Sequence, residues 1–139
     1  MNFESREALI AAARAARERA YAPYSKFAVG AALLDDQGRV HAGCNVENAA
    51  YPQGWCAETS ALAAMVLAGG RQVRALAVVT DSSAACTPCG GCRQRLREFA
   101  QADCPVHLAG LEGWRATHTL GELLPHAFGP DQLDPPWPG

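Results

Sequence analysis

The chain has 139 residues, a hydrophobic fraction of 49%, a charged fraction of 19% and a formal net charge of −2. We expect one domain spanning residues 1–139, because the length suits a single domain and the composition is too apolar for a disordered chain. The longest uncharged run, residues 59–70, is shorter than the ~20 residues of a membrane span. The N-terminus carries acids where a signal peptide would be basic, so we expect a cytoplasmic protein without a membrane segment.

Charge and cysteine content narrow the class of function. Twelve basic and fourteen acidic residues leave no positive excess. A protein that binds many phosphates normally presents a basic face, so this balance favours a small uncharged substrate over nucleic acid. Disulfides are rare in the cytoplasm, so closely spaced members of the six cysteines indicate metal or redox chemistry.

Hydrophobic periodicity, together with glycines and prolines, predicts helices and strands along the whole chain. In chain order these are a helix over 4–20, strands over 27–34 and 40–46, a helix over 57–68, a strand over 73–80, a helix over 88–100, a strand over 106–111, a shorter strand after Gly113 and a short helix from Thr119. Residues after about 133 are expected to be irregular. This order predicts a single sandwich of the α/β class.

Two short motifs place cysteines at the starts of predicted helices. Cys56 and Glu58 lie where a loop leads into one helix, and Cys89 and Cys92 lie at the start of another. Free N–H groups and the helix dipole there favour thiolate over thiol. Three sulfurs suit a tetrahedral Zn²⁺ ion, and three protein ligands leave the fourth position for water, as in catalytic sites. Glu58 can reach that water without being a ligand.

Other interpretations of the cysteines stay open at this point. A C-x-x-C pair alone also occurs in redox proteins and in structural zinc sites. Cys86 starts a second, overlapping C-x-x-C, but we favour Cys92 because Cys86 precedes Pro88 and so lies outside the helix. We expect Cys44 and Cys104 to be small buried apolar residues, and the four histidines show no ligand spacing.

The pattern C-x-E followed by P-C-x-x-C is the zinc deaminase signature, with cysteine in place of the first histidine. Beyond that motif, residues 21 to about 133 resemble the small, homotetrameric class of cytidine deaminase with three cysteine ligands. The matching stretches, in the family's order and spacing, are 21–27 (YAPYSKF), 29–33 (VGAAL), 43–51 (GCNVENAAY), 56–58 (CAE), 88–94 (PCGGCRQ) and 123–128 (LLPHAF). The resemblance implies a three-layer α/β/α sandwich with a mixed five-stranded sheet.

The resemblance also implies the reaction and its metal. The reaction would be hydrolytic deamination of cytidine and 2′-deoxycytidine to the uridines, with release of ammonia, in pyrimidine salvage. One Zn²⁺ per subunit would be held by Cys56, Cys89 and Cys92 and would activate water. Glu58 would be the catalytic group, taking a proton from water and delivering protons to ring N3 and to the departing amine.

Substrate contacts follow from the resemblance as well. Asn45 and Glu47 would hydrogen-bond the ribose 3′-hydroxyl, Phe27 would pack against the pyrimidine, and the backbone of Ala57 would bind the ring amide. In a homotetramer the positions that would reach a neighbouring subunit's site are Ala49, Tyr51 and Phe128. The resemblance therefore implies active sites shared between subunits, with monomers inactive.

One position departs from the family pattern. Thr59 stands where most members of this class have an arginine that offsets the thiolate charge. Three thiolates and one Zn²⁺ sum to −1, and helix N-termini, hydrogen bonds to sulfur or Arg93 could compensate. We expect a shifted acid limb of the pH–rate profile or an altered zinc affinity. Trp55, where family side chains vary, is assigned no role.

Several alternative functions remain at the level of sequence. The nearest is a deaminase of another free nucleoside or a nucleoside-like antibiotic, because the zinc and glutamate chemistry would be the same. A polynucleotide editor fits the net charge less well. A non-catalytic zinc module would want a fourth protein ligand, and a dithiol redox protein would not need Glu58.

Overall fold

The computed structural model describes residues 3–133, with side chains described from Ser5 onwards. Its helices and strands, in chain order, are α1 (Phe3–Arg17), β1 (Gly30–Asp35), β2 (Val40–Cys44), the short 3₁₀ helix η1 (Tyr51–Gln53), α2 (Ala57–Leu67), β3 (Val73–Val79), α3 (Gly90–Phe99), β4 (Pro105–Gly110), β5 (Gly113–Thr119), α4 (Leu120–Leu123) and the 3₁₀ helix η2 (Pro130–Gln132). The irregular tail predicted after residue 133 lies outside the described residues.

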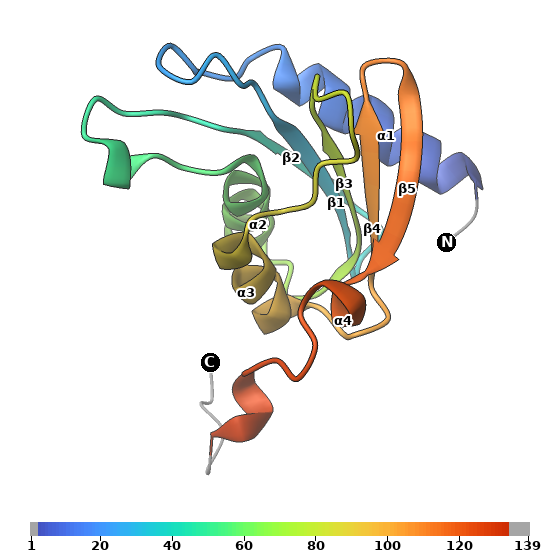
Figure 1. The fold of residues 1–139 in the computed structure, drawn as a ribbon. Helices are drawn as coiled ribbons and strands as arrows, with labels where there is room; N and C mark the ends of the chain where they lie inside the picture. The colour runs from blue at the N-terminus through green and yellow to red at the C-terminus, as the bar shows by residue number, and fades with distance from the viewer. Residues whose placement is uncertain (1–2, 134–139) are drawn as a thin grey trace.

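The strands form one five-stranded sheet in the order β2-β1-β3-β4-β5. Strands β3 and β4 are parallel, and every other neighbouring pair is antiparallel. Helix α1 covers one face of this sheet, and α2 and α3 lie on the other face (Figure 1). The predicted α/β class, the mixed five-stranded sheet and the three layers are therefore confirmed.

The two faces of the sheet carry separate apolar cores. Along β1, Ala31 and Leu33 belong to the core under α2 and α3, whereas Ala32 belongs to the core under α1. This alternation follows from the two-residue period of a strand. From α1, Leu9 and Ile10 fill the second core. With both faces covered, the central strands read as continuous apolar runs.

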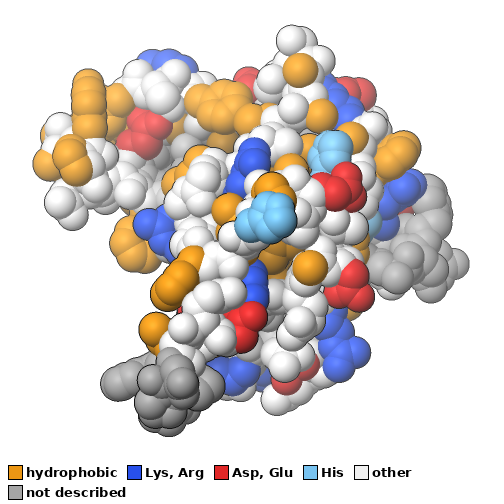
Figure 2. Space-filling view, turned by 60° about the horizontal axis from the view of Figure 1, so that its bottom comes forward, with side chains coloured by type: hydrophobic (Ala, Val, Ile, Leu, Met, Phe, Trp, Pro, Cys, Tyr) orange, Lys and Arg blue, Asp and Glu red, His pale blue; other side chains and the backbone are white. Residues whose placement is uncertain are grey.

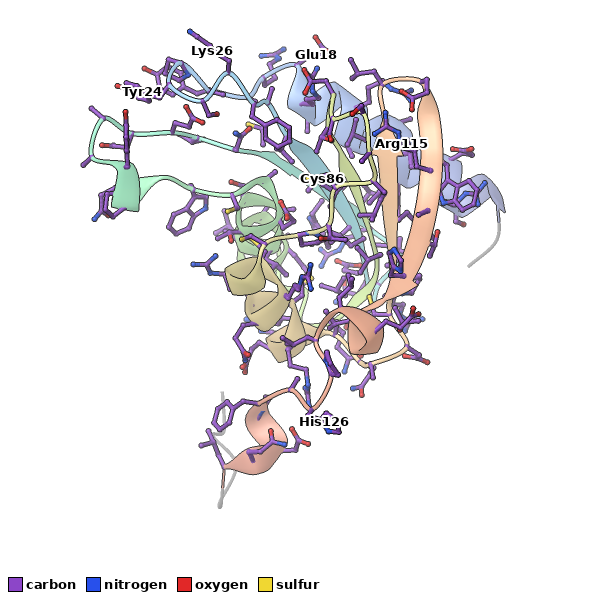
Figure 3. All side chains as sticks on the ribbon, in the orientation of Figure 1. Glu18, Tyr24, Lys26, Cys86, Arg115 and His126 are labelled. Atoms are coloured by element: carbon purple, nitrogen blue, oxygen red, sulfur yellow. The ribbon has the colours of Figure 1, made fainter. Side chains whose placement is uncertain are left out.

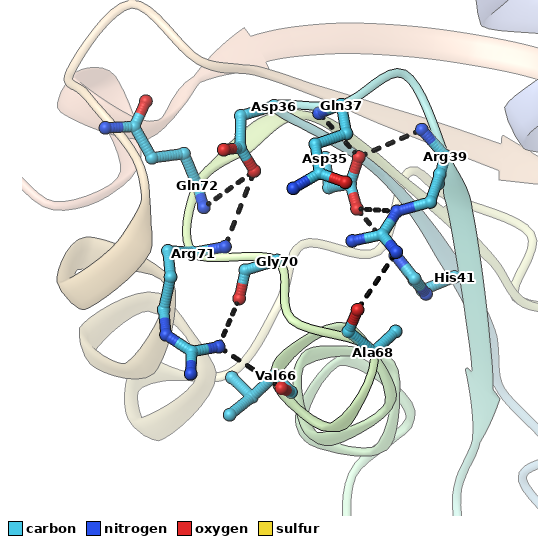
Figure 4. Close-up of polar contacts among 10 residues, drawn as sticks. All are labelled: Asp35, Asp36, Gln37, Arg39, His41, Val66, Ala68, Gly70, Arg71 and Gln72. Carbon is cyan, nitrogen blue, oxygen red and sulfur yellow. Dashed lines mark hydrogen bonds and ion pairs between the residues drawn. The ribbon is translucent and has the colours of Figure 1, made fainter.

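A buried carboxylate fixes the turn between β1 and β2 (Figure 4). Asp35 is fully buried and accepts hydrogen bonds from the backbone N–H groups of Gln37 and Arg39, from Arg39 Nε at 2.9 Å and from His41 Nε2 at 2.8 Å. Burial opposes its ionisation, but these hydrogen bonds hold the pKa of the Asp35 carboxyl well below its usual range. Arg39 Nη1 also donates to the carbonyl oxygen of Ala68, directly after α2. The network therefore ties the hairpin to the end of α2.

The largest differences from the predicted elements lie around the loop that precedes β1. The helix predicted over 4–20 ends at Arg17, and the strand predicted over 27–34 begins only at Gly30. Side chains bind most of the backbone here: Phe27 N donates to Ser25 Oγ, and Val29 N donates to an asparagine oxygen. The only backbone hydrogen bond to residues 27–29 in the described chain comes from Asn45 N, directly after β2, to the carbonyl oxygen of Val29. The loop also contains Lys26 with φ of 62°, which a strand does not allow.

The second half of the chain follows the predicted order closely. The capping box at Thr119 is confirmed, since Glu122 N donates to Thr119 Oγ1 and Thr119 N donates to Glu122 Oε1. The strand expected to be shorter is not, because β5 has seven residues against six in β4. Helix α3 begins at Gly90, so Pro88 precedes the helix rather than opening it.

Charged side chains of both signs are interspersed on the face shown in Figure 2. This agrees with the near-neutral charge of the sequence. Among the helices that the structure describes, none is both long enough and apolar enough to cross a membrane.

Candidate active site

Two helix starts bring three cysteine sulfurs together. Cys56 is the N-cap of α2, Cys89 is the N-cap of α3, and Cys92 lies in the first turn of α3. The three sulfurs all lie within 4.8 Å of one another, and the Cys56 and Cys89 sulfurs are 3.9 Å apart. The structure therefore assembles the three residues that the spacing of the motifs singles out as ligands.

This donor set fits zinc. Zinc–thiolate bonds of about 2.3 Å in tetrahedral geometry place sulfurs about 3.8 Å apart, which matches the Cys56–Cys89 separation. Cys86 lies outside the cluster, as its place before Pro88 suggests, and no histidine of the described chain joins it. With three soft protein ligands, the fourth coordination position is left for a non-protein ligand.

The sulfurs differ in exposure and in acidity. Cys92 is fully buried, Cys56 is half-buried and Cys89 is exposed. Hydrogen bonding with the Cys92 thiol lowers the pKa of Cys56. The same contact, together with burial, raises the pKa of Cys92. Of the two cysteines outside the cluster that were predicted to be buried, Cys104 is buried, whereas Cys44 is only half-buried.

Glu58 lies in the first turn of α2 and is 5% exposed. Burial raises the pKa of its carboxyl above the usual value. A carboxyl whose pKa is moved toward neutrality can accept a proton in one step and donate it in the next. Its place beside the three sulfurs is where such a group would meet an activated water.

A cavity of about 470 Å³ opens over this cluster. Its floor carries Cys56, Glu58 and Cys89, and its walls include Phe27, Val29, Asn45, Glu47, Tyr51, Trp55, Val78, Thr80, Cys86 and Thr87. Ala57 is fully buried and also lines it. The volume is within the range of small-molecule sites.

The loop between β3 and α3 closes one side of the cavity. Figure 3 shows Cys86 on this loop and Arg115 on β5 beside it. Arg115 Nη1 donates to the carbonyl oxygens of Ser82 and Ala84, so β5 holds the loop in place. By contrast, Figure 3 places His126 on the C-terminal segment, far from Tyr24 and Cys86.

Asn45 binds the backbone of the loop before β1. Its Oδ1 accepts from Val29 N at 2.9 Å, and its Nδ2 donates to the carbonyl oxygen of Phe27 at 2.8 Å. Asn45 therefore positions Phe27, which is half-buried in the cavity wall. This positioning role lies beyond the substrate contact that the resemblance implies.

Glu47 holds the same loop from its other end. Its Oε1 accepts from Tyr24 N at 2.9 Å and Ser25 N at 3.1 Å, and Ser25 Oγ donates to Oε2. These hydrogen bonds lower the pKa of Glu47. The carboxylate therefore stays ionised at neutral pH at the mouth of the cavity.

The positions expected to serve a neighbouring subunit are exposed in the single chain. Tyr51 is 74% exposed and lines the cavity rim, and Phe128 is 59% exposed. Ala49 is also exposed, and neither Ala49 nor Phe128 lines the cavity of its own chain. Trp55, to which the sequence assigned no role, is 51% exposed and lines the cavity next to Cys56.

Arg93, considered as a group that could offset the thiolate charge, makes its hydrogen bonds away from the three sulfurs. It donates to the carbonyl oxygens of Pro88 and Leu123 and so braces the start of α3. The arginine that reaches a sulfur of the cluster is Arg95, whose Nη1 lies 3.9 Å from Cys92 Sγ. Sequence reasoning missed it, although its spacing of three from Cys92 places both on one helix face.

Comparison with known proteins assigns the family. The model for the cytidine and deoxycytidylate deaminase zinc-binding region matches residues 3–108. The chain belongs to the cytidine deaminase family. A cytidine deaminase of Sporosarcina psychrophila is 48% identical over 127 residues, which cover 91% of this chain and 93% of the relative. One of Halalkalibacterium halodurans is 46% identical, covering 93% of this chain and 98% of the relative.

Solved structures of the cytidine deaminase family share the fold. The crystal structure of cytidine deaminase from Burkholderia pseudomallei has a TM-score of 0.84 and 46% identity, covering 92% of this chain and 100% of that one. That from Mycobacterium tuberculosis has a TM-score of 0.75 and 43% identity, covering 88% and 95%. The predicted family resemblance, fold class and enzyme class, a cytidine deaminase, are thereby confirmed.

Proposed function

We propose that this chain catalyses the zinc-dependent hydrolysis of cytidine and 2′-deoxycytidine to the corresponding uridines and ammonia. The observation that carries the proposal is the buried carboxyl of Glu58 beside three clustered sulfurs, with Glu58 and two of the cysteines, Cys56 and Cys89, lining one cavity. A structural zinc site or a redox pair would not require that carboxyl. Membership of the cytidine deaminase family supports the choice of substrate.

Cys56, Cys89 and Cys92 would hold the metal, one ion per subunit. When bound, zinc would supply the Lewis acidity that makes water a nucleophile near neutral pH. Glu58 takes a proton from that water and donates to ring N3, which makes C4 of the pyrimidine electrophilic. The carboxylate then takes the second proton of the added water from the new C4 hydroxyl and passes it to the 4-amino group. The C4 carbonyl forms as the C4–N bond breaks, so water is consumed and ammonia is released.

The cavity walls supply the proposed substrate contacts. Phe27 packs against the pyrimidine, and the backbone of Ala57 binds the ring amide next to Glu58. The ionised carboxylate of Glu47, at the cavity mouth, accepts from the ribose 3′-hydroxyl, and Asn45 contributes its amide to the same contact. Such a site requires a free 3′-hydroxyl and so favours free nucleosides.

We also propose a homotetramer in which Ala49, Tyr51 and Phe128 complete a neighbour's site. The exposure of Tyr51 and Phe128 supports this, since large aromatic side chains at 74% and 59% exposure are suited to an interface. Analytical ultracentrifugation should give four times the chain mass of 14.7 kDa.

We further propose a cytoplasmic location, because that compartment would keep the six free cysteines of the chain reduced. An enzyme that acts on free nucleosides would serve pyrimidine salvage.

The proposal is tested by following the loss of cytosine absorbance with cytidine, with 2′-deoxycytidine and with a 3′-substituted cytidine. We expect turnover of the first two, little of the third, and loss of activity after removal of metal by a chelator, with recovery on adding Zn²⁺. Absence of turnover of both natural nucleosides would overturn the proposed activity. Turnover that survives complete metal removal would overturn the proposed role of zinc.

A further inference from the structure

Cys92 is the sulfur of the site that water cannot reach. It is 0% exposed, whereas Cys89 is exposed and Cys56 is half-buried. Solvent can stabilise the charge on an exposed thiolate, but a buried one depends on hydrogen bonds from the protein. Two side chains can supply such hydrogen bonds: Thr59 from α2 and Arg95 from the next turn of α3.

Thr59 and Arg95 converge on this sulfur. Thr59 Oγ1 lies 3.6 Å from Cys92 Sγ, and Arg95 Nη1 lies 3.9 Å from it. Arg95 Nη1 also donates to Thr59 Oγ1 at 3.1 Å. Because a guanidinium only donates, this contact uses a lone pair of the threonine oxygen and leaves the hydroxyl proton to point at the sulfur. Cys92 therefore faces two donors, one of which carries a full positive charge.

The helix explains why Arg95 reaches back to the site. Arg95 follows Cys92 by three residues, so the two side chains share a face of α3. Long helical side chains lean toward the N-terminus, which here is the metal-ligand end. The guanidinium lies along the helix over Gly91, where an added Cβ would touch Arg95 Nη1 at 3.5 Å. Its charge is thus directed along the helix toward the sulfur.

The positive charge of Arg95 can offset the negative charge of the proposed zinc–thiolate centre. Three thiolates and one divalent zinc ion sum to −1, and Thr59 brings no charge. Arg95 contributes +1 and returns the sum to zero. We propose that Arg95 is a positioning residue which, with Thr59 as a hydrogen-bond relay, holds the Cys92 thiolate and keeps zinc bound. This inference rests on the proposed zinc site and adds the residues that retain the metal.

The test times zinc transfer from zinc-loaded enzyme to an excess of a chromophoric chelator near neutral pH. We expect Arg95→Gln to release zinc about 10-fold faster or more, in line with the effect of residues that support metal ligands. Thr59→Val should also release it faster, and Arg95→Lys, which keeps the charge, should stay nearer the parent. The matched control is Arg97→Gln, which loses the same charge from the same helix but pairs with Asp131 at 2.8 Å.

A second readout reports on the sulfur itself. In the Co²⁺-substituted protein, loss of a cationic donor raises the energy of the sulfur lone pairs, so the sulfur-to-cobalt charge-transfer band should move to longer wavelength in Arg95→Gln and not in Arg97→Gln. Thermal melting and sedimentation of each variant show whether folding and assembly are unchanged. An Arg95→Gln protein with the parental zinc-release rate and an unmoved band would overturn the inference. A parent chain that binds no zinc would instead overturn the proposed function.

Discussion

At the scale of single residues, Asn45 and Glu47 each hydrogen-bond the loop before β1, and each is also proposed to contact the substrate. Glu47 accepts two backbone hydrogen bonds and one from Ser25 Oγ while lining the cavity. A substitution at either residue therefore changes loop position and substrate binding together. Separating the two effects requires a substrate that lacks only the contacted hydroxyl.

We predict that Glu47→Gln raises KM for cytidine about 10- to 100-fold, the value of a lost hydrogen bond to a charged group. KM for 3′-deoxycytidine should change much less, because that substrate has no 3′-hydroxyl. Steady-state kinetics with both nucleosides measure the difference. The control is Ser25→Ala, which weakens the same loop contact and should affect the two substrates equally. If Glu47→Gln raises KM equally for both substrates, Glu47 holds the loop but does not bind the 3′-hydroxyl.

The residue scale also shows what the sequence can predict of the site. Cys56 and Glu58 lie within one short motif and Cys89 and Cys92 within another, so local spacing predicts each pair. The two motifs are 33 positions apart, and their meeting was expected from the family resemblance rather than from local spacing. The contact between Thr59 and Arg95 spans 36 positions and depends on how α2 packs against α3. No local sequence pattern predicts that packing. Arg93, which directly follows Cys92, is therefore the more obvious candidate in the sequence for offsetting the thiolate charge.

At the scale of elements, the start of α2 carries Cys56 and Glu58, and its end is tied to the β1–β2 turn through Asp35 and Arg39. The sequence predicts this turn from its Asp and Gly residues, but not that one aspartate is fully buried and the next is not. Likewise it places a strand from residue 27, because an apolar run does not reveal that side chains bind the backbone of residues 27–29.

We predict that Asp35→Asn lowers the melting temperature by several degrees. The amide cannot replace the charge that faces Arg39 and His41, and it brings an N–H₂ group against donors. Thermal unfolding followed by circular dichroism measures the effect. Asp36→Asn is the matched control, since Asp36 is less buried and accepts only long backbone hydrogen bonds of 3.4 Å from Arg71 and Gln72. A melting temperature equal to that of the control would contradict the structural role of Asp35.

At the scale of the whole molecule, the layer under α1 contains a histidine that resists protonation. His107 on β4 is 5% exposed and its Nδ1 lies 2.8 Å from Thr117 Oγ1. Burial, reinforced by the positive charge of Arg6 on α1, lowers the pKa of His107 to about 4. The unfolded chain, with a histidine pKa near 6.5, therefore binds a proton between about pH 6.5 and 4 that the folded protein does not.

The part of the free energy of unfolding that depends on neutral His107 should therefore be fully present above about pH 6.5. It should be lost as the pH is lowered, and by pH 5 the loss should be about 2 kcal/mol. Urea unfolding of the parent and of His107→Gln at pH 7.5 and pH 5 measures this, because the difference between the two proteins cancels other titrations. The variant should lose less stability than the parent over this range. Equal losses in the parent and His107→Gln would exclude His107 as the source.

The central claim is that Glu58 moves the protons of the reaction beside a zinc ion held by three cysteines. Glu58→Gln keeps the shape of the side chain but cannot take up a proton, so we predict a loss of at least 10²- to 10⁴-fold in kcat for cytidine. Zinc content by mass spectrometry should stay at one ion per chain. Glu98→Gln, on the exposed side of α3, should leave both values unchanged. A Glu58→Gln enzyme that retains its zinc and deaminates cytidine at close to the parental rate would contradict the account.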